Sequence, residues 1–135
     1  MKLFFKLILV FSFNAKAGVQ SLDQAQVKKH SKGAEIRFLA NKTHHAKNAF
    51  VGQLTVPAGG KVPLHQDETE EYIYVLSGAG TIWIDGQKHS IKKEDLVYMP
   101  AKAKVRFENG KKPLKALQIF AGPGPEKKYQ SKAWK

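Results

Sequence analysis

Residues 59–80 read GGKVPLHQDETEEYIYVLSGAG, and this stretch decides the fold. A glycine turn and a short extended segment lead to His65, and a strongly β-prone run begins at Tyr72. Between them stand four acidic residues within five positions: Asp67, Glu68, Glu70 and Glu71. A buried strand that brings histidine and carboxylates to its end is how a β-barrel presents metal ligands or an acid/base pair. The stretch therefore predicts a barrel wall and the position of a functional site.

Short β-prone segments continue on both sides of this stretch, and helical periodicity is nearly absent. Gly, Pro or Asn turns separate them. The expected segments are 35–40, 50–56, 72–76, 81–84, 87–91, 96–99, 103–108 and 114–121. Asp85-Gly86 predicts a type I′ hairpin turn, because this dipeptide tolerates the positive φ values that the turn requires. About eight to ten short strands so spaced indicate an all-β antiparallel sandwich or barrel.

The spacing of the central stretch resembles a known sequence motif. Gly59, His65, Asp67, Glu71 and Gly78 follow the intervals of the first cupin motif, G-x5-H-x-H-x3,4-E-x6-G. Pro100 and Asn109 resemble the second cupin motif, G-x5-P-x-G-x2-H-x3-N. This resemblance runs from about residue 50 to 121 and implies a double-stranded β-helix, a jelly-roll barrel with a site in its mouth. We expect the whole barrel to span residues 34–122. The resemblance also implies a homodimer, because single-domain cupins are commonly dimers.

The chain departs from the cupin pattern at four positions. Asp67 stands in place of the second histidine ligand, and Val105 stands in place of the third. Glu94 and Lys102 replace the two glycines of the second motif. What the resemblance leaves is a metal-binding set of one histidine and two carboxylates: His65, Asp67 and Glu71. Such an oxygen-rich set favours Mn²⁺, Fe²⁺ or a similar divalent ion over tight zinc binding.

Other residues are candidates for the surroundings of this site. A polar side chain from another strand, such as Gln53 or Gln118, is expected to complete the metal shell or to contact a ligand. Tyr98 and Val105 are expected to contribute to the ligand-binding wall. The acids around Asp67 also fit a solvated loop without a metal. His44, His45 and His89 fit surface positions better than ligand positions.

The two ends of the chain differ from the barrel in composition. Residues 1–17 have a basic start, a short apolar run and a small-x-small ending, Ala15-Lys16-Ala17, and we interpret them as a signal peptide. The apolar run is far shorter than the roughly 20 residues of a membrane span, so no stable membrane anchor is expected. Residues 18–33 form a polar lead-in, and 123–135 form a basic C-terminal tail that Tyr129 and Trp134 can pin to the barrel or to a partner. The protein is therefore predicted to be exported, to the periplasm or beyond the cell.

The charge of the chain does not indicate nucleic acid binding. Loss of Lys2, Lys6 and Lys16 with the signal lowers the formal net charge from +12 to +9. The remaining lysines are scattered, and only Arg37 and Arg106 are arginines, whereas nucleic acid surfaces favour clustered arginine with aromatic residues. The absence of cysteine excludes thiolate nucleophiles and Cys-ligated zinc.

Two functions fit the sequence best. The first is an exported protein that binds a small molecule in the barrel mouth, with or without a divalent metal. The alternative is a metal-dependent cupin oxygenase or isomerase acting on a small metabolite, for which Glu70 or Glu71 is a candidate base. A third reading, docking of the basic surface on anionic cell-envelope polymers, rests on charge alone.

Overall fold

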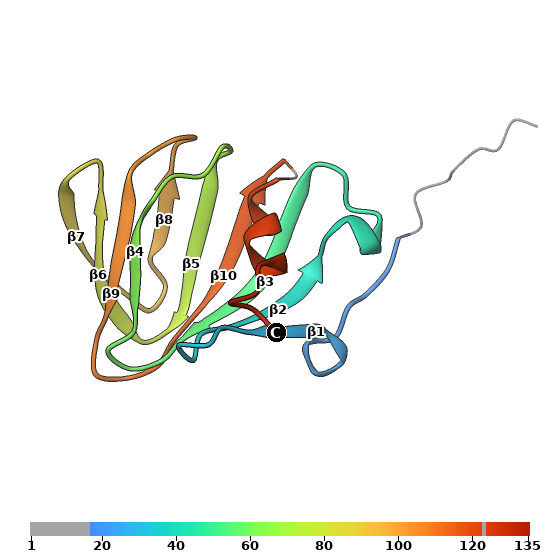
Figure 1. Ribbon diagram of the computed structural model, residues 1–135, viewed down its shortest axis with the longest axis horizontal. Coiled ribbons are helices and arrows are strands. Elements are labelled where there is room, and N and C mark those ends of the chain that lie inside the picture. Colours follow the sequence, from blue (N-terminus) through green and yellow to red (C-terminus); the bar gives the residue numbers. More distant parts are fainter. Residues whose placement is uncertain (1–16, 123) are drawn as a thin grey trace, which may run out of the picture.

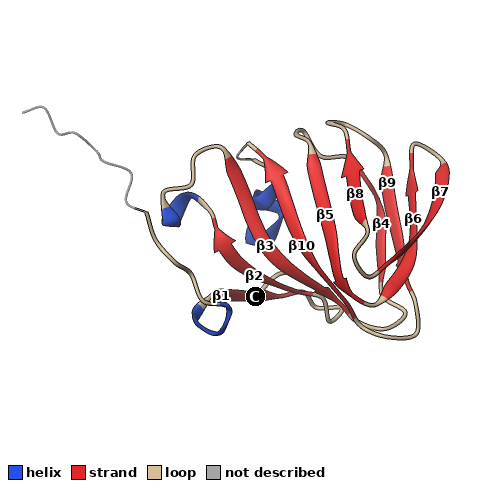
Figure 2. Cartoon of the chain, turned by 180° about the vertical axis from the view of Figure 1, so that it is seen from behind, coloured by secondary structure: helices blue, strands red, loops and turns tan. Residues whose placement is uncertain are grey.

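The computed structural model describes residues 17–122 and 124–135, and strands dominate this part of the chain (Figures 1 and 2). One sheet has six strands in the order β1-β2-β3-β10-β5-β8, and the other has four in the order β4-β9-β6-β7. Neighbouring strands in both sheets run antiparallel. The predicted all-β jelly-roll barrel is confirmed.

The strands fall close to the expected segments. Their bounds are β1 Gln26–Lys29, β2 Glu35–Ala40, β3 Ala49–Val56, β4 Lys61–His65, β5 Glu71–Ser77, β6 Ala79–Ile84, β7 Gln87–Lys92, β8 Leu96–Met99, β9 Val105–Asn109 and β10 Leu114–Ala121. Three short 3₁₀ segments complete the described elements: η1 Leu22–Gln24, η2 Lys42–His44 and η3 Pro125–Gln130. Strand β1 was not expected, because its polar sequence lacks strand periodicity; pairing with β2 makes it a strand.

The core lies between the two sheets, and side-chain alternation builds it. In β5, Glu71, Ile73 and Val75 are buried, whereas Tyr72 and Tyr74 between them face outward. The inward side chains form one apolar cluster: Val56, Ile73, Val75, Ile82, Ile91, Val97, Met99, Ala103, Val105, Phe107, Leu114 and Ala116. Full burial of a side chain of this kind stabilises the fold by about 1.5–3 kcal/mol. Glu71 is thus a carboxylate placed at an otherwise apolar inward position.

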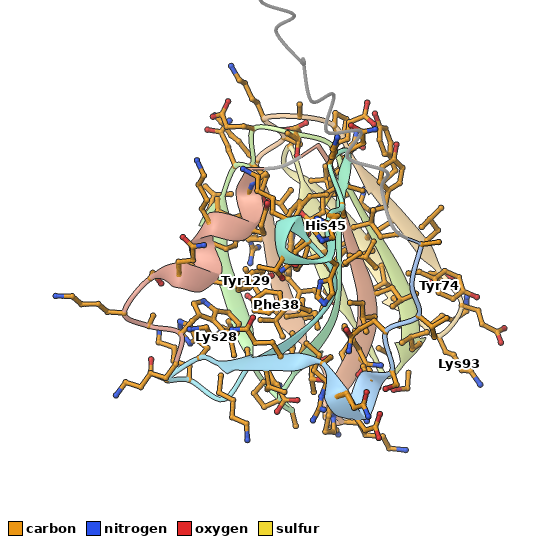
Figure 3. All side chains as sticks on the ribbon, turned by 90° about the vertical axis from the view of Figure 1, so that its right-hand side faces the viewer. Lys28, Phe38, His45, Tyr74, Lys93 and Tyr129 are labelled. Atoms are coloured by element: carbon orange, nitrogen blue, oxygen red, sulfur yellow. The ribbon has the colours of Figure 1, made fainter. Side chains whose placement is uncertain are left out.

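A second cluster joins the C-terminal segment to the six-stranded sheet. The Tyr129 ring in η3 lies 6.0 Å from the rings of both Phe38 and Phe50. Figure 3 shows the labelled Phe38 and Tyr129 side by side near the centre of the molecule. Beyond η3, backbone hydrogen bonds pair Lys135 with Lys29, and Trp134 bridges to His30. The basic tail is therefore packed against the barrel.

Positive φ angles explain the glycines of the first motif. Gly59 has φ 67° and Gly78 has φ 88°, a region that residues with a Cβ rarely adopt. A Cβ on Gly78 would also lie 2.6 Å from the Pro113 carbonyl oxygen. The predicted hairpin turn has the same property, with φ 49° at Asp85 and 83° at Gly86. These values fit a type I′ turn.

The two residues that replace the glycines of the second motif have the positive φ angles that glycine adopts most easily. Glu94 has φ 72° and Lys102 has φ 64°. A left-handed conformation costs an ordinary residue about 1–2 kcal/mol. The chain has therefore kept the turn geometry of the motif at both positions while losing the residue type that adopts it most easily.

The structure does not extend to the predicted signal peptide, since residues 1–16 of the expected segment 1–17 lie outside the described residues. Within residues 17–122 and 124–135, no helix has the length and apolar character needed to cross a membrane.

Candidate functional site

Three predicted ligands converge at the barrel mouth. His65 ends β4, Asp67 lies in the following loop, and Glu71 opens β5. One donor atom of each lies within 4.8 Å of the donor atoms of the other two. The His65 Nε2 atom is 3.5 Å from Asp67 Oδ2. The chain leaves one sheet at His65 and enters the other at Glu71, and this crossing brings the three side chains together.

Val105 flanks the site on the neighbouring strand β9 and offers no donor atom. It pairs directly with His65 across β4 and β9, and it is buried. This is the position of the third histidine in the cupin motif. The triad, defined here as His65, Asp67 and Glu71, is therefore open on that side except for an aliphatic wall.

Glu71 is held by a buried chain of hydrogen bonds. Gln118 in β10 donates from Nε2 to Glu71 Oε1 over 2.7 Å. The Tyr129 hydroxyl donates in turn to Gln118 Oε1. Gln118 was an expected site residue, whereas Tyr129 was expected only to pin the tail; no local sequence signal links a tail tyrosine to a glutamate in β5.

Asp67 is paired with a lysine from the C-terminal segment. The Lys128 Nζ atom lies 2.7 Å from Asp67 Oδ1 and 2.9 Å from Oδ2. Sequence reasoning missed Lys128, because it is one lysine among many and lies 61 positions from its partner. The basic tail thus supplies a cation to the predicted metal site.

The pKa values of the two carboxyl groups of the triad are shifted in opposite directions. Burial raises the pKa of Glu71 and outweighs the hydrogen bond from Gln118, which lowers it. Burial alone would also raise the pKa of Asp67, but hydrogen bonds from His65 and Lys128 reverse the effect and lower it. The hydrogen bond to Asp67 raises the pKa of His65. Asp67 is therefore held as a carboxylate, while Glu71 is shifted towards the protonated acid.

The structure does not bring Gln53 and Tyr98 to the triad. Gln53 in β3 faces outward and lines a surface hollow together with Arg37 and Lys115, because alternation turns it away from the core. Tyr98 in β8 is 49% exposed, and its ring lies 5.3 Å from that of Tyr72 on the outer face. Their distance from the triad follows from the register of the strands, which the sequence does not specify at single-residue level.

The remaining histidines weighed in the sequence lie away from the triad. His44 is in η2, exposed, and contacts the side chains of Asn41 and Gln20. His45 follows it with φ 60° in a turn, not on a strand. His89 is exposed on β7.

Two cavities meet at the triad. An apolar inner cavity of about 150 Å³ lies between the sheets and is lined by Ile73, Val105 and Phe107, among others. An outer groove of about 820 Å³ lies at the mouth, with Lys61, Asp67 and Pro125 in its walls. His65, Lys128 and Trp134 line both. The site thus stands where a deep apolar space opens to the surface.

The donor set fits a divalent metal ion. One imidazole and two carboxylates converge, and Val105 leaves a coordination direction without a protein ligand. The Lys128 ammonium, however, already contacts the carboxylate of Asp67. An ion at the triad has to compete with this contact.

Comparison with known proteins decides the family. The family model for the cupin domain matches residues 52–120, about half of the chain. The chain belongs to the cupin family. The match runs from β3 to β10 and so includes all three residues of the triad. The cupin fold therefore positions the site, while Lys128 and Tyr129 lie outside the matched region.

Two further comparisons show what this cupin is similar to. Over 69 residues this cupin is 41% identical to the uncharacterized protein MJ1618 of Methanocaldococcus jannaschii, covering 50% of this chain and 55% of that protein. The aligned part thus spans little more than half of that relative. A crystal structure of an RmlC-like cupin from Shewanella frigidimarina has a TM-score of 0.73 at 12% identity, covering 82% of this chain and 96% of that chain.

An enzyme is among the structures of the same fold. The polyketide cyclase RemF from Streptomyces resistomycificus has a TM-score of 0.71 at 17% identity, and 82% of each chain is covered. At such identities the likeness concerns the fold alone.

Proposed function

We propose that this cupin binds a small organic molecule at the barrel mouth, beside a divalent metal ion held by His65, Asp67 and Glu71. The observation that carries the proposal is the meeting of the two cavities at the triad. A ligand there has an apolar space for its carbon skeleton and polar groups at the entrance. Small-molecule sites commonly combine these two features.

The groove favours an anionic ligand. Lys32, Lys61 and Lys128 line it, and Asp67 is the only acid among its described lining residues. A bound divalent ion would add to the positive charge. An organic acid of moderate size fits this charge and the apolar inner space better than a cation does.

Metal analysis tests the ion site. Protein purified without added metal is analysed for bound Mn and Fe, and its melting temperature is followed during titration with Mn²⁺ and Fe²⁺. We expect stabilisation that is lost in His65→Ala and Glu71→Ala and kept in His89→Ala, the matched control on β7. A protein that contains no metal and does not respond to either ion would overturn the metal part of the proposal.

The second candidate is a metal-dependent oxygenase or isomerase. Burial of Glu71 favours it, because a raised pKa brings the carboxyl group closer to the range in which it can both give and accept a proton. A bound metal would supply Lewis-acid activation of the substrate. Incubation of the metal-loaded protein with a mixture of small organic acids, followed by mass spectrometry, separates the two candidates. Conversion by the wild type that is absent in Glu71→Gln supports the enzyme, and recovery of every acid unchanged supports the binding protein.

We also propose that two copies associate through the outer face of the six-stranded sheet. Tyr74, Leu96 and Tyr98 are exposed there, and the edge strand β8 carries two of them. Figure 3 shows Tyr74 at the periphery of the molecule. Clustered exposed apolar side chains of this kind mark contact surfaces. Light scattering of Leu96→Lys should give a monomer where the wild type gives a dimer; a monomeric wild type would refute the association.

Export remains part of the proposal. It rests on the composition of residues 1–17. N-terminal sequencing of protein recovered outside the cytoplasm should begin at Gly18. An intact Met1 on that material would contradict cleavage.

A further inference from the structure

A close ionic contact at the triad is made by a residue that is not among the proposed metal ligands. Lys128 places its ammonium on both oxygens of Asp67, at 2.7 and 2.9 Å. We propose that Lys128 is an internal competitor of the metal ion and sets the threshold affinity for an ion to enter the triad. This inference rests on the metal site proposed above and adds a selectivity residue to it.

The fold holds Lys128 in place. It lies in η3 next to Tyr129, which is buried against Phe38 and Phe50 and hydrogen-bonded to Gln118. The Lys128 Nζ atom also lies 5.0 Å from the centre of the Phe120 ring. Because the neighbouring residue anchors the segment, the ammonium is presented to Asp67 at a high effective concentration. A lysine on a free tail would not compete in this way.

Charge and geometry make the competition direct. The ammonium and a divalent ion both require the carboxylate of Asp67, and Lys128 occupies both of its oxygens. An ion bound while the ammonium stayed in place would meet a like charge at short range. Ion entry therefore displaces the Lys128 side chain, and its flexible four-carbon stem allows this without movement of Tyr129.

The lysine contact therefore makes the site select metal ions by how tightly they bind the triad. An ion that binds the triad weakly does not overcome the lysine contact, whereas an ion that binds strongly does. The missing third histidine lowers the affinity of the triad itself. The two departures from the family pattern thus act in the same direction and restrict the site to strong binders or to high ion concentrations.

Isothermal titration calorimetry with Mn²⁺ at fixed pH and ionic strength tests the inference. Lys128→Met keeps an unbranched side chain only one atom shorter but removes the charge, and Lys128→Arg keeps the charge. Lys127→Met is the matched control, because its side chain is exposed and it precedes Lys128 directly. We expect Lys128→Met to bind Mn²⁺ at least tenfold more tightly than the wild type. We expect Lys127→Met and Lys128→Arg to stay within about twofold of it. If Lys128→Met does not fold, Lys128→Gln carries the same test.

A second readout follows the lysine itself. In the wild type, saturation with diamagnetic Zn²⁺ should shift the NMR signals of the Lys128 ε-methylene group and leave those of Lys127 unchanged. Zn²⁺ binding with unchanged Lys128 signals, or equal Mn²⁺ affinity of wild type and Lys128→Met, would overturn the competition while leaving the metal site standing. Absence of binding to both wild type and folded Lys128→Met would overturn the metal site and the inference together.

Discussion

The two walls of the barrel mouth differ in what they contribute to the site. The first wall, formed by the segment of the first motif, has His65 at the end of β4 and Glu71 at the start of β5, with Asp67 between them. The second wall, formed by the segment of the second motif, places Val105 on β9, directly beside His65 in the same four-stranded sheet. One wall retains polar side chains at the family positions, and the other has replaced its ligand with an aliphatic group.

The second wall has nevertheless kept its architecture. The Asn109 Nδ2 atom lies 3.1 Å from the Val56 carbonyl oxygen and 2.9 Å from those of Pro57 and Lys112, so this motif residue joins the end of β3 to the turn before β10. Glu94 and Lys102 keep positive φ angles without being glycine. The comparison shows that residues which shape the backbone and residues which do chemistry can be lost separately. Here the partners of the carboxylates come from β10 and the tail, as Gln118 and Lys128.

The largest expected effect is on metal affinity. Restoring the missing histidine ligand at position 105 should give both walls a metal-binding side chain. Val105→His places an imidazole beside His65, and we expect Mn²⁺ or Zn²⁺ to bind about 100-fold more tightly, or about 2.7 kcal/mol. Titration calorimetry measures the change. Arg106→His, on the same strand but turned to the other side, is the control and should gain nothing. Equal affinities of the two variants would show that the walls are not positioned to share an ion.

Breaking the hydrogen-bond chain from Tyr129 through Gln118 to Glu71 should lower the stability of the fold. Tyr129→Phe removes the hydroxyl that donates to Gln118 and leaves a buried acceptor without its donor. We expect a loss of about 1–3 kcal/mol in the free energy of unfolding, measured by urea denaturation. Tyr98→Phe, on the exposed outer face, should change it by about 0.5 kcal/mol or less. A neutral Tyr129→Phe would mean that the Glu71–Gln118 pair does not depend on the tail.

The opposite pKa shifts on the first wall predict how stability depends on pH. Glu71 and His65 have raised pKa values in the folded protein, so above their ordinary values of 4.5 and 6.5 the folded state holds protons that the unfolded state has lost. Stability should therefore fall as pH rises above about 4.5 because of Glu71 and above about 6.5 because of His65, by at most about 1.4 kcal/mol per pH unit for each group. The lowered pKa of Asp67 acts oppositely, since its contribution is lost only on acidification below its ordinary value of 3.8.

Melting temperatures between pH 5 and 8, measured with a chelator present, check this dependence. Glu71→Gln should flatten the decline, because an amide does not titrate. Glu68→Gln is the control, since its side chain is 82% exposed, and it should leave the slope unchanged. Parallel curves for wild type and Glu71→Gln would remove Glu71 as a source of the decline.

The smallest effect concerns the retained turn geometry. Lys102→Gly and Glu94→Gly should each stabilise the fold by about 0.5–1 kcal/mol, because glycine adopts positive φ without the strain of a Cβ and the gain exceeds the added entropy of the unfolded chain. Thermal or urea denaturation measures it. Lys93→Gly, whose φ is not positive, should instead destabilise. Destabilisation by all three would show that the turns carry no such strain.

Much of the fold was predictable from sequence because local rules apply to it. Alternation in β5, the Asp85-Gly86 turn and the motif glycines are each set by residues close together in the chain. The positions of His65 and Glu71 followed from motif spacing for the same reason. The face on which Gln53 and Tyr98 lie was not predictable, since a register change of one residue moves a side chain to the other side of a sheet.

By itself, the sequence determined that this chain folds as a jelly-roll barrel, with His65, Asp67 and Glu71 at one end of it. Only the tertiary structure decided what surrounds these three residues. Lys128 and Tyr129 reach the triad from the far end of the chain, and packing of η3 on Phe38 and Phe50 brings them there. Contacts between distant segments depend on the whole fold and leave no spacing to read. The charge balance of the mouth is for that reason a property of the folded molecule.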